Sequence, residues 1–145
     1  MSVTPLGPRR RLTDSAVFQT LLRQGRRLVA GPITVRLLNA GPVGRIGLSI
    51  AKRHLKKATD RNAVKRMARE AYRLRGQAMN GVDVLILLSE GAKARDAVRQ
   101  LPAELKVKSG RRRVRSAIEA GLDQAEAAAQ SSQSPRDRTG QRAAG

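Results

Sequence analysis

The spacing of apolar residues changes along the chain, and this change divides the sequence into predicted helices and strands. Residues 13–24 carry apolar side chains at helical spacing. Thr13 or Asp14 can cap the start of this helix, and Gly25 suits the position just after its end. We therefore expect a first helix that closes at Gly25 and carries Phe18, the only phenylalanine of the chain.

Two alternating segments follow this helix and predict strands. Residues 28–38 alternate apolar and polar positions, although Gly31 and Pro32 interrupt the start. Turn-forming residues 39–44 lead to a second strand at residues 45–53. One face of this second strand bears only small residues, namely Gly47, Ser49 and Ala51. Such a face lets another group approach the backbone closely.

Residues 58–75 predict a helix in which an apolar stripe runs beside a cationic one. The apolar stripe consists of Val64, Met67, Ala68, Ala71 and Tyr72. The cationic stripe consists of Arg61, Asn62, Lys65, Arg66, Arg69 and Arg73. Like charges at helical spacing cost about 0.2–0.5 kcal/mol per pair, and neither Asp60 nor Glu70 falls within the stripe. We therefore expect this stripe to face the phosphates of a nucleic acid.

The second half of the chain predicts one more strand and a long helix. Residues 82–91 contain a continuous apolar run, which is typical of a strand buried on both faces. The basic helix lies between two strands in sequence and can therefore be the crossover of a parallel pair. Pro102 limits a short helical stretch, and an amphipathic helix begins near residue 109. The composition of residues 129–145 indicates a disordered tail.

Length and composition favour one basic domain. The 145 residues, 40% of them apolar, suit a single modest core. We expect a flexible basic arm at residues 1–11 and an RNA-binding domain at residues 12–128. A net charge of +19 implies a nucleic-acid partner. We expect no membrane binding, because the basic helix lacks Trp, Phe or Leu on its apolar face. Without cysteine or a long apolar segment, the protein is expected to be cytoplasmic.

The side chains offer little for catalysis or metal binding. The single histidine, His54, builds no catalytic grouping or metal site alone, and the eleven carboxylates are scattered. We interpret Asp60, Glu70 and Asp83 as surface or capping charges. A second cationic group precedes the basic helix and consists of Lys52, Arg53, Lys56 and Lys57. This excess of positive charge favours contact with RNA or DNA.

The order of residues 47–73 resembles the signature of the bacterial ribonuclease P protein component. In that family a strand ends in a Ser-Lys-Lys-like turn and leads into a helix with the pattern Arg-Asn-x-x-Lys-Arg-x-x-Arg-Glu. Here residues 51–53 stand at the turn, and the helix supplies in order Arg61, Asn62, Lys65, Arg66, Arg69 and Glu70. Residues 12–27 resemble the family's first helix, with its Phe and closing Gly, and the resemblance extends over residues 12–90.

The resemblance implies an α/β (α+β) two-layer sandwich. A small mixed sheet of about four strands would pack with about three helices, with a left-handed crossover around the basic helix. The resemblance also implies a non-catalytic subunit of an endonuclease whose RNA removes the 5′ leader of precursor tRNA. Mg2+ would be bound mainly by the RNA and not by the protein alone. The expected partners are ribonuclease P RNA and precursor tRNA, and no protein partner is required.

By the same resemblance, two surfaces have separate roles. The catalytic RNA is expected to bind Arg61, Asn62, Lys65, Arg66, Arg69 and Arg73. The leader is expected in a cleft between the first helix and the sheet, lined by Phe18, Leu22, Arg36, Ser49, Lys52 and Arg53. This chain has Ala63 where the family often has Arg, and Ile33 and Arg36 where it tends to have aromatics. We therefore expect leader binding here to be more electrostatic than is usual in the family.

The alternative is a non-catalytic ribosomal or RNA-chaperone protein of the same basic α/β character. Charge alone does not separate the two readings, but the ordered pattern of residues 47–73 favours the ribonuclease P subunit. A DNA-binding architectural protein would need a dimer seam or wedge residues for the minor groove, and the sequence shows neither. A protein-only nuclease would need a cluster of carboxylates, whereas the eleven carboxylates of this chain are scattered.

Overall fold

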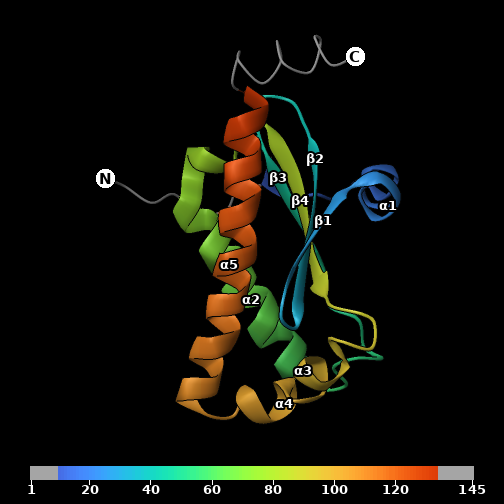
Figure 1. Ribbon diagram of the computed structural model, residues 1–145, viewed down its shortest axis with the longest axis vertical. Coiled ribbons are helices and arrows are strands. Elements are labelled where there is room, and N and C mark those ends of the chain that lie inside the picture. The colour runs from blue at the N-terminus through green and yellow to red at the C-terminus, as the bar shows by residue number, and fades with distance from the viewer. Residues whose placement is uncertain (1–9, 134–145) are drawn as a thin grey trace.

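A mixed four-stranded sheet lies at the centre of the computed structural model, which describes residues 10–133 (Figure 1). Helix α1 lies on one face of the sheet, and the long helices α2 and α5 lie on the other. In chain order the elements are α1 (Ser15–Gln24), β1 (Arg26–Ala30), β2 (Ile33–Asn39), β3 (Arg45–Ser49), α2 (Ala58–Arg75), the 3-10 helix η2 (Gly76–Met79), β4 (Val82–Leu88), α3 (Arg95–Arg99), α4 (Leu101–Glu104) and α5 (Lys108–Gln133).

The strand order β1-β2-β4-β3 confirms the expected mixed sheet. Strand β2 pairs antiparallel with both β1 and β4, whereas β3 pairs parallel with β4. Because α2 connects the two parallel strands, it is the expected crossover, and the left hand of that crossover stays a prediction. The described residues form five α-helices rather than about three, because the segment around Pro102 contains two short helices, α3 and α4.

The expected single strand at residues 28–38 is instead a hairpin of β1 and β2. Ala30 pairs with Ile33, so Gly31 and Pro32 form a two-residue turn. Gly31 has a φ of 59°, which is the left-handed conformation that the first central position of such a turn requires. The expected strand at residues 45–53 is also shorter, because β3 ends at Ser49.

The main core lies between one face of the sheet and the helices α2 and α5. All five residues of the apolar stripe expected on α2 are buried there. The apolar face of the amphipathic helix α5 is buried there too, with Val114, Ile118, Leu122 and Ala125 in the core and Ala117 partly buried against it. Ala129, one turn further along α5, is only 1% exposed. The helix continues through Gln133, so residues 129–133 are helical rather than part of the tail expected from residue 129 onward. Residues 134–145 lie outside the described part of the chain.

Most of the expected basic arm, residues 1–9, also lies outside the described part. Arg10 and Arg11, at the end of this arm, contact the folded domain. Arg10 donates to Asn80 Oδ1 at 3.0 Å and lies over the Tyr72 ring, while Arg11 forms a β-bridge with Ile46. Among the helices that the structure describes, none combines the length and apolar character that crossing a membrane demands.

A smaller apolar cluster forms on the opposite face of the sheet, under α1. It contains Leu12, Leu21 and Leu85, with Phe18 packed against it. A Cβ atom built on Gly47 would lie 2.9 Å from Phe18 Cε2 and 3.0 Å from Leu12 Cδ2. The small-residue face of β3 therefore does admit a close approach, but at Gly47 the approaching groups are the protein's own side chains.

Asp83 is buried, which corrects its interpretation as a surface or capping charge. Asp83 is 4% exposed. It accepts one hydrogen bond from the backbone N–H of Arg45 at 3.1 Å and another from the Nη2 atom of the Arg45 side chain at 2.7 Å. The two residues are register partners on the parallel strands β3 and β4. The hydrogen bond to the carboxylate raises the pKa of Arg45, so the guanidinium group stays charged and its ion pair with Asp83 joins the two strands.

Gly25 follows the end of α1 and packs closely against Leu21 and Arg36. Asp14 caps the start of α1 as expected, through its bond from Ala16 N. Gly25, however, has an extended φ of −65° and not the left-handed conformation expected of a glycine after a helix. A Cβ atom there would lie only 2.4 Å from the carbonyl oxygen of Leu21 and 3.3 Å from Arg36 Cβ. Gly25 is therefore needed for close packing.

This packing predicts that Gly25→Ala destabilises the protein. We expect the free energy of unfolding to fall by about 1–3 kcal/mol, because the backbone of α1 must move away from the added methyl group. Urea denaturation followed by circular dichroism measures this change. Gly41→Ala is the matched control, because a Cβ at Gly41 meets no atom within 4 Å and its φ is not positive. Equal stability of the two variants would contradict the packing role.

Candidate nucleic-acid interface

The outer face of α2 presents a row of cations because its inner face is fully committed to the core. Asn62, Arg66 and Arg69 are exposed, and Lys65 is half-buried. A groove of about 310 Å³ runs along this face and is lined by Asn62, Arg66, Arg69, Glu70 and Arg73. In the described residues Lys65, Arg66 and Arg69 form no ion pair. Their charges are therefore available to an anionic partner.

Two members of the expected cationic stripe have internal partners. Arg61 donates through Nη1 to the carbonyl oxygens of Leu55 at 2.9 Å and Lys56 at 2.7 Å, so it holds the turn that precedes α2. Arg73 forms an ion pair with Glu70. Glu70 therefore lies in the groove, although the sequence placed it outside the stripe. The cations without such a partner are those in the middle of the helix.

The other face of the sheet contains the residues expected to bind the leader. The strand register places Arg27, Arg36, Leu85 and Gly47 in one row across all four strands. Phe18 of α1 covers the Gly47 end of this row. Arg36 is half-buried, and its Nη1 donates to the carbonyl oxygen of Gly25 at 3.1 Å, which ties its side chain to the end of α1.

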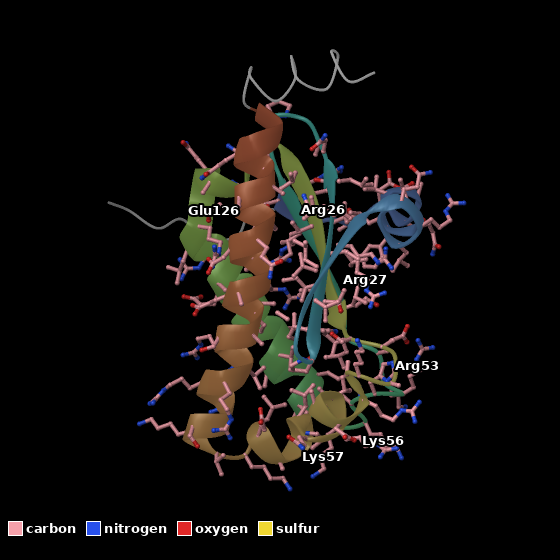
Figure 2. The ribbon with its side chains drawn as sticks, viewed as in Figure 1. Arg26, Arg27, Arg53, Lys56, Lys57 and Glu126 are labelled. Atoms are coloured by element: carbon pink, nitrogen blue, oxygen red, sulfur yellow. The ribbon has the colours of Figure 1, made fainter. Side chains whose placement is uncertain are left out.

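The remaining leader-binding candidates extend this surface in two directions. Leu22 is 37% exposed and lies one helical turn after Phe18, so both point to the same side of α1. Ser49 lies in the next row of the sheet, paired with Leu87, and Lys52 and Arg53 are exposed in the loop that follows. Figure 2 shows Arg27 and Arg53 on the side of the molecule that carries α1. The structure thus brings Phe18, Leu22, Arg36, Ser49 and Arg53 to one side of the sheet, and Lys52 lies in the loop next to Arg53.

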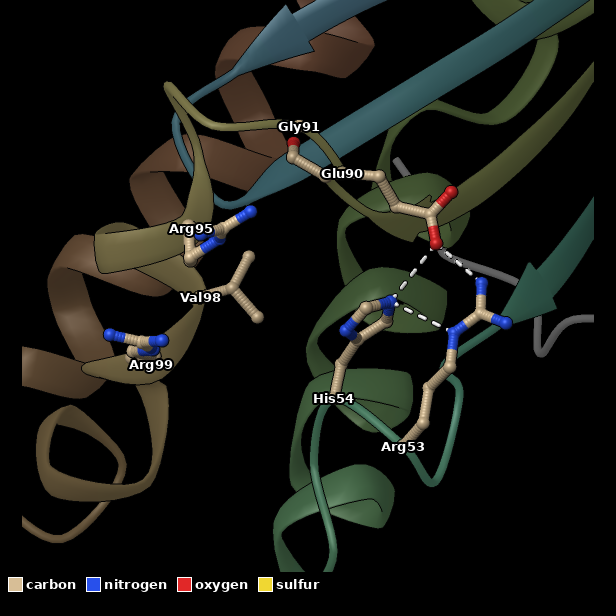
Figure 3. Close-up of a pocket in the computed structure, with 8 residues that line it drawn as sticks. Arg53, His54, Glu90, Gly91, Arg95, Val98 and Arg99 are labelled. Carbon is tan, nitrogen blue, oxygen red and sulfur yellow. Dashed lines mark hydrogen bonds and ion pairs between the residues drawn. The ribbon is translucent and has the colours of Figure 1, made fainter.

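A basic pocket of about 410 Å³ opens where β4 ends (Figure 3). It is lined by Arg53, His54, Ser89, Glu90, Gly91, Arg95, Val98 and Arg99. Glu90 forms an ion pair with Arg53 and lies 3.1 Å from His54 Nε2. The contact with His54, and then that with Arg53, lowers the pKa of Glu90, so its carboxyl group is ionised at neutral pH.

Sequence reasoning missed most of this pocket. Arg53 was identified from the cationic group before α2 and through the resemblance, but Ser89, Arg95 and Arg99 were not. The one local signal was the four-residue spacing of Arg95 and Arg99, which places both guanidinium groups on the same side of a helix. Their approach to Arg53 depends on the fold, because α3 follows β4 while Arg53 follows the neighbouring strand β3.

Comparisons with known proteins agree with this structure. Residues 6–107 match the family described as Ribonuclease P. Ribonuclease P protein components from Nitrosococcus oceani and Yersinia enterocolitica are 34% and 37% identical over 82 and 83 residues; each match spans 56% of this chain and 69% of the relative.

Solved structures show the same fold. The RNase P protein of Staphylococcus aureus aligns with a TM-score of 0.63 at 20% identity, over 80% of this chain and 94% of that one. The RNase P protein of Thermotoga maritima aligns with a TM-score of 0.55 at 21% identity, over 76% and 96%. Because the family match spans most of the chain and the fold agrees with it, the chain belongs to the ribonuclease P protein family.

Proposed function

We propose that this protein component of ribonuclease P docks on the catalytic RNA through the outer face of α2. The observation that carries the proposal is the row of Lys65, Arg66 and Arg69, which is held in place by a fully buried inner face and has no acidic partner in the described residues. A rigid row of cations suits a folded RNA, because each phosphate contact releases condensed counterions. Binding also relieves the repulsion within the row.

The second part of the proposal places the 5′ leader of precursor tRNA on the sheet face beside α1. Arg27 and Arg36 lie there in one row, and exposed Lys52 and Arg53 lie towards its end. A flat, cationic strip next to a single aromatic ring suits an unpaired strand, because phosphates bind the cations while bases lie on the apolar surface. Phe18 packs against the protein core, so its ring is less available for stacking than the arginines are for phosphates.

Magnesium is proposed to enter with the RNA. The described residues bring no three His, Cys, Asp or Glu side chains together, whereas cations dominate both surfaces. Mg2+ would supply the activation of water and the stabilisation of developing negative charge during cleavage. The protein's part is to bind and align two RNAs and to offset their mutual repulsion. A ribosomal or RNA-chaperone role would use the same cations without a specific effect on cleavage.

Single-turnover cleavage of a precursor tRNA by the matching catalytic RNA at low Mg2+ tests this proposal. We expect the protein to restore cleavage at the correct 5′ position only when the RNA is present. The reason is that Lys and Arg side chains neutralise phosphates that otherwise require Mg2+. Tight RNA binding with no effect on cleavage would instead support the chaperone reading, and cleavage by protein alone would contradict both.

The docking role of α2 predicts a specific loss in the triple variant Lys65→Ala, Arg66→Ala, Arg69→Ala. Affinity for the catalytic RNA should fall, and the slope of log K against log salt should decrease by about 2–3, because about one counterion is released for each phosphate contact. Filter binding across a salt series measures both quantities.

The control for this experiment removes the same charge from Lys108, Arg112 and Arg115, which are exposed on α5. Arg61 stays unchanged in both variants, because its bonds to Leu55 and Lys56 give it a structural role. If both variants lower the slope equally, the effect is one of net charge, and the specific role of α2 is wrong.

The electrostatic character of leader binding predicts a difference between Arg36→Ala and Phe18→Ala. In the holoenzyme, Arg36→Ala should weaken binding of precursor tRNA more than Phe18→Ala, with no effect of Arg36→Ala on mature tRNA, which lacks the leader. Because Phe18 belongs to the α1 cluster, its variant should instead show the larger fall in thermal stability. A larger loss of leader affinity in Phe18→Ala at unchanged stability would refute this view.

A further inference from the structure

We propose that the basic pocket at the end of β4 is a phosphate subsite for a more distant part of the precursor tRNA leader. This inference rests on the proposed leader-binding role of the sheet face and extends it to Arg95 and Arg99, which lie outside the expected cleft. The ligand is a phosphodiester group of the leader RNA. Location, charge and lining of the pocket each support this assignment.

The pocket continues the surface on which the leader is proposed to lie. Successive residues of a strand alternate between its two faces, so Leu85, Leu87 and Ser89 share the face that carries α1. The bond between Ser89 Oγ and Thr34 Oγ1, 2.8 Å, confirms that both side chains point to this side. Ser89 lines the pocket and lies four residues after Leu85, or roughly 13 Å along the strand. One extended strand of RNA can therefore reach both places.

The charges around the pocket favour an anionic ligand. Arg95 and Arg99 lie one turn apart on α3, and Figure 3 shows them across the pocket from Arg53 and His54. Within the described residues neither guanidinium group has a hydrogen bond or an ion pair. Glu90 is the only acidic group in the lining, so three arginines share one carboxylate. A phosphate would relieve this repulsion, and guanidinium groups bind it with paired hydrogen bonds.

Glu90 acts as an internal counter-ion in the free protein. Its carboxylate binds Arg53 and contacts His54, which leaves the Arg95 and Arg99 side of the pocket open. A leader phosphate would enter on that open side and compete with Glu90 for Arg53. The lining also argues against an apolar small molecule, because Val98 is the only large apolar residue in it and drug-like sites are mostly apolar.

The test uses holoenzyme assembled from the catalytic RNA and either wild-type protein or Arg95→Ala, Arg99→Ala. Binding of precursor tRNAs with leaders of increasing length is measured by single-turnover titration. We expect wild-type affinity to rise when the leader becomes long enough to reach the pocket. The double variant should lose this gain, with roughly tenfold weaker binding of the longest leader and unchanged binding of the shortest.

Two further variants make the result specific. Arg112→Ala, Arg115→Ala removes equal charge from α5 and should keep the gain with leader length; an equal loss in this control would overturn the subsite. Glu90→Gln removes the competing charge and should tighten binding of long leaders only; weaker binding would overturn the role of Glu90 as a competing counter-ion.

The remaining outcomes separate this inference from the proposed function. If wild-type protein stimulates cleavage but the double variant keeps the full gain with leader length, the subsite is wrong and the proposed function stands. If the double variant loses affinity for the catalytic RNA instead, the pocket binds that RNA and the leader subsite is wrong. If wild-type protein shows no dependence on leader length, the leader-binding role fails, and the subsite fails with it.

Discussion

The burial of β4 on both faces is the constraint on which the rest of the structure depends. A strand that is apolar on both sides must be covered on both sides. The helices α2 and α5 cover one face along its length, whereas the ten-residue helix α1 covers only part of the other. The uncovered part bears Arg27, Arg36 and Ser49 beside one exposed valine, Val29. Partial covering of one sheet thus creates both a core and an exposed, mainly polar surface.

Internal partners determine which of the many cations are available to RNA. With 30 Lys and Arg against 11 Asp and Glu, most positive side chains cannot find an internal anion. The few acids are used selectively: Asp83 joins β3 to β4, and Glu90 pairs with Arg53 in the free protein. Arg61 is taken up by backbone carbonyl groups. The remaining cations are available to bind an anionic partner. The positive net charge of the protein also raises the concentration of such a partner near the surface.

Sequence reasoning succeeded where a feature depends on spacing within one segment. The buried stripe from Val64 to Tyr72 follows from helical periodicity, and the burial of β4 follows from its apolar run. The hairpin was missed because Gly31 and Pro32 were interpreted as an interruption, although a two-residue turn with Gly first is a hairpin signal. Here the local information was present but was assigned to the wrong structure.

Features that depend on strand register or on elements distant in sequence could not be predicted from spacing within one segment. The burial of Asp83 requires Arg45 on a neighbouring strand, and only the parallel register brings the two together. The approach of Arg95 to Arg53 likewise requires the crossover of α2 between the two strands. The expected cleft residues lie on one side of the sheet, but their binding roles stay predictions, since a surface does not by itself reveal its ligand.

The position of α5 has a consequence for how the chain folds during synthesis. This helix packs on β1, β2 and α2, and Gly121 lets Val35 of β2 approach it closely. The ribosome completes the sheet and α2 before α5, so the part of the apolar sheet face that α5 covers stays exposed until this helix emerges. Contacts between segments so distant in sequence slow folding and leave intermediates prone to aggregation. The nascent chain therefore carries the cations of α2 before it has a closed core to support that helix.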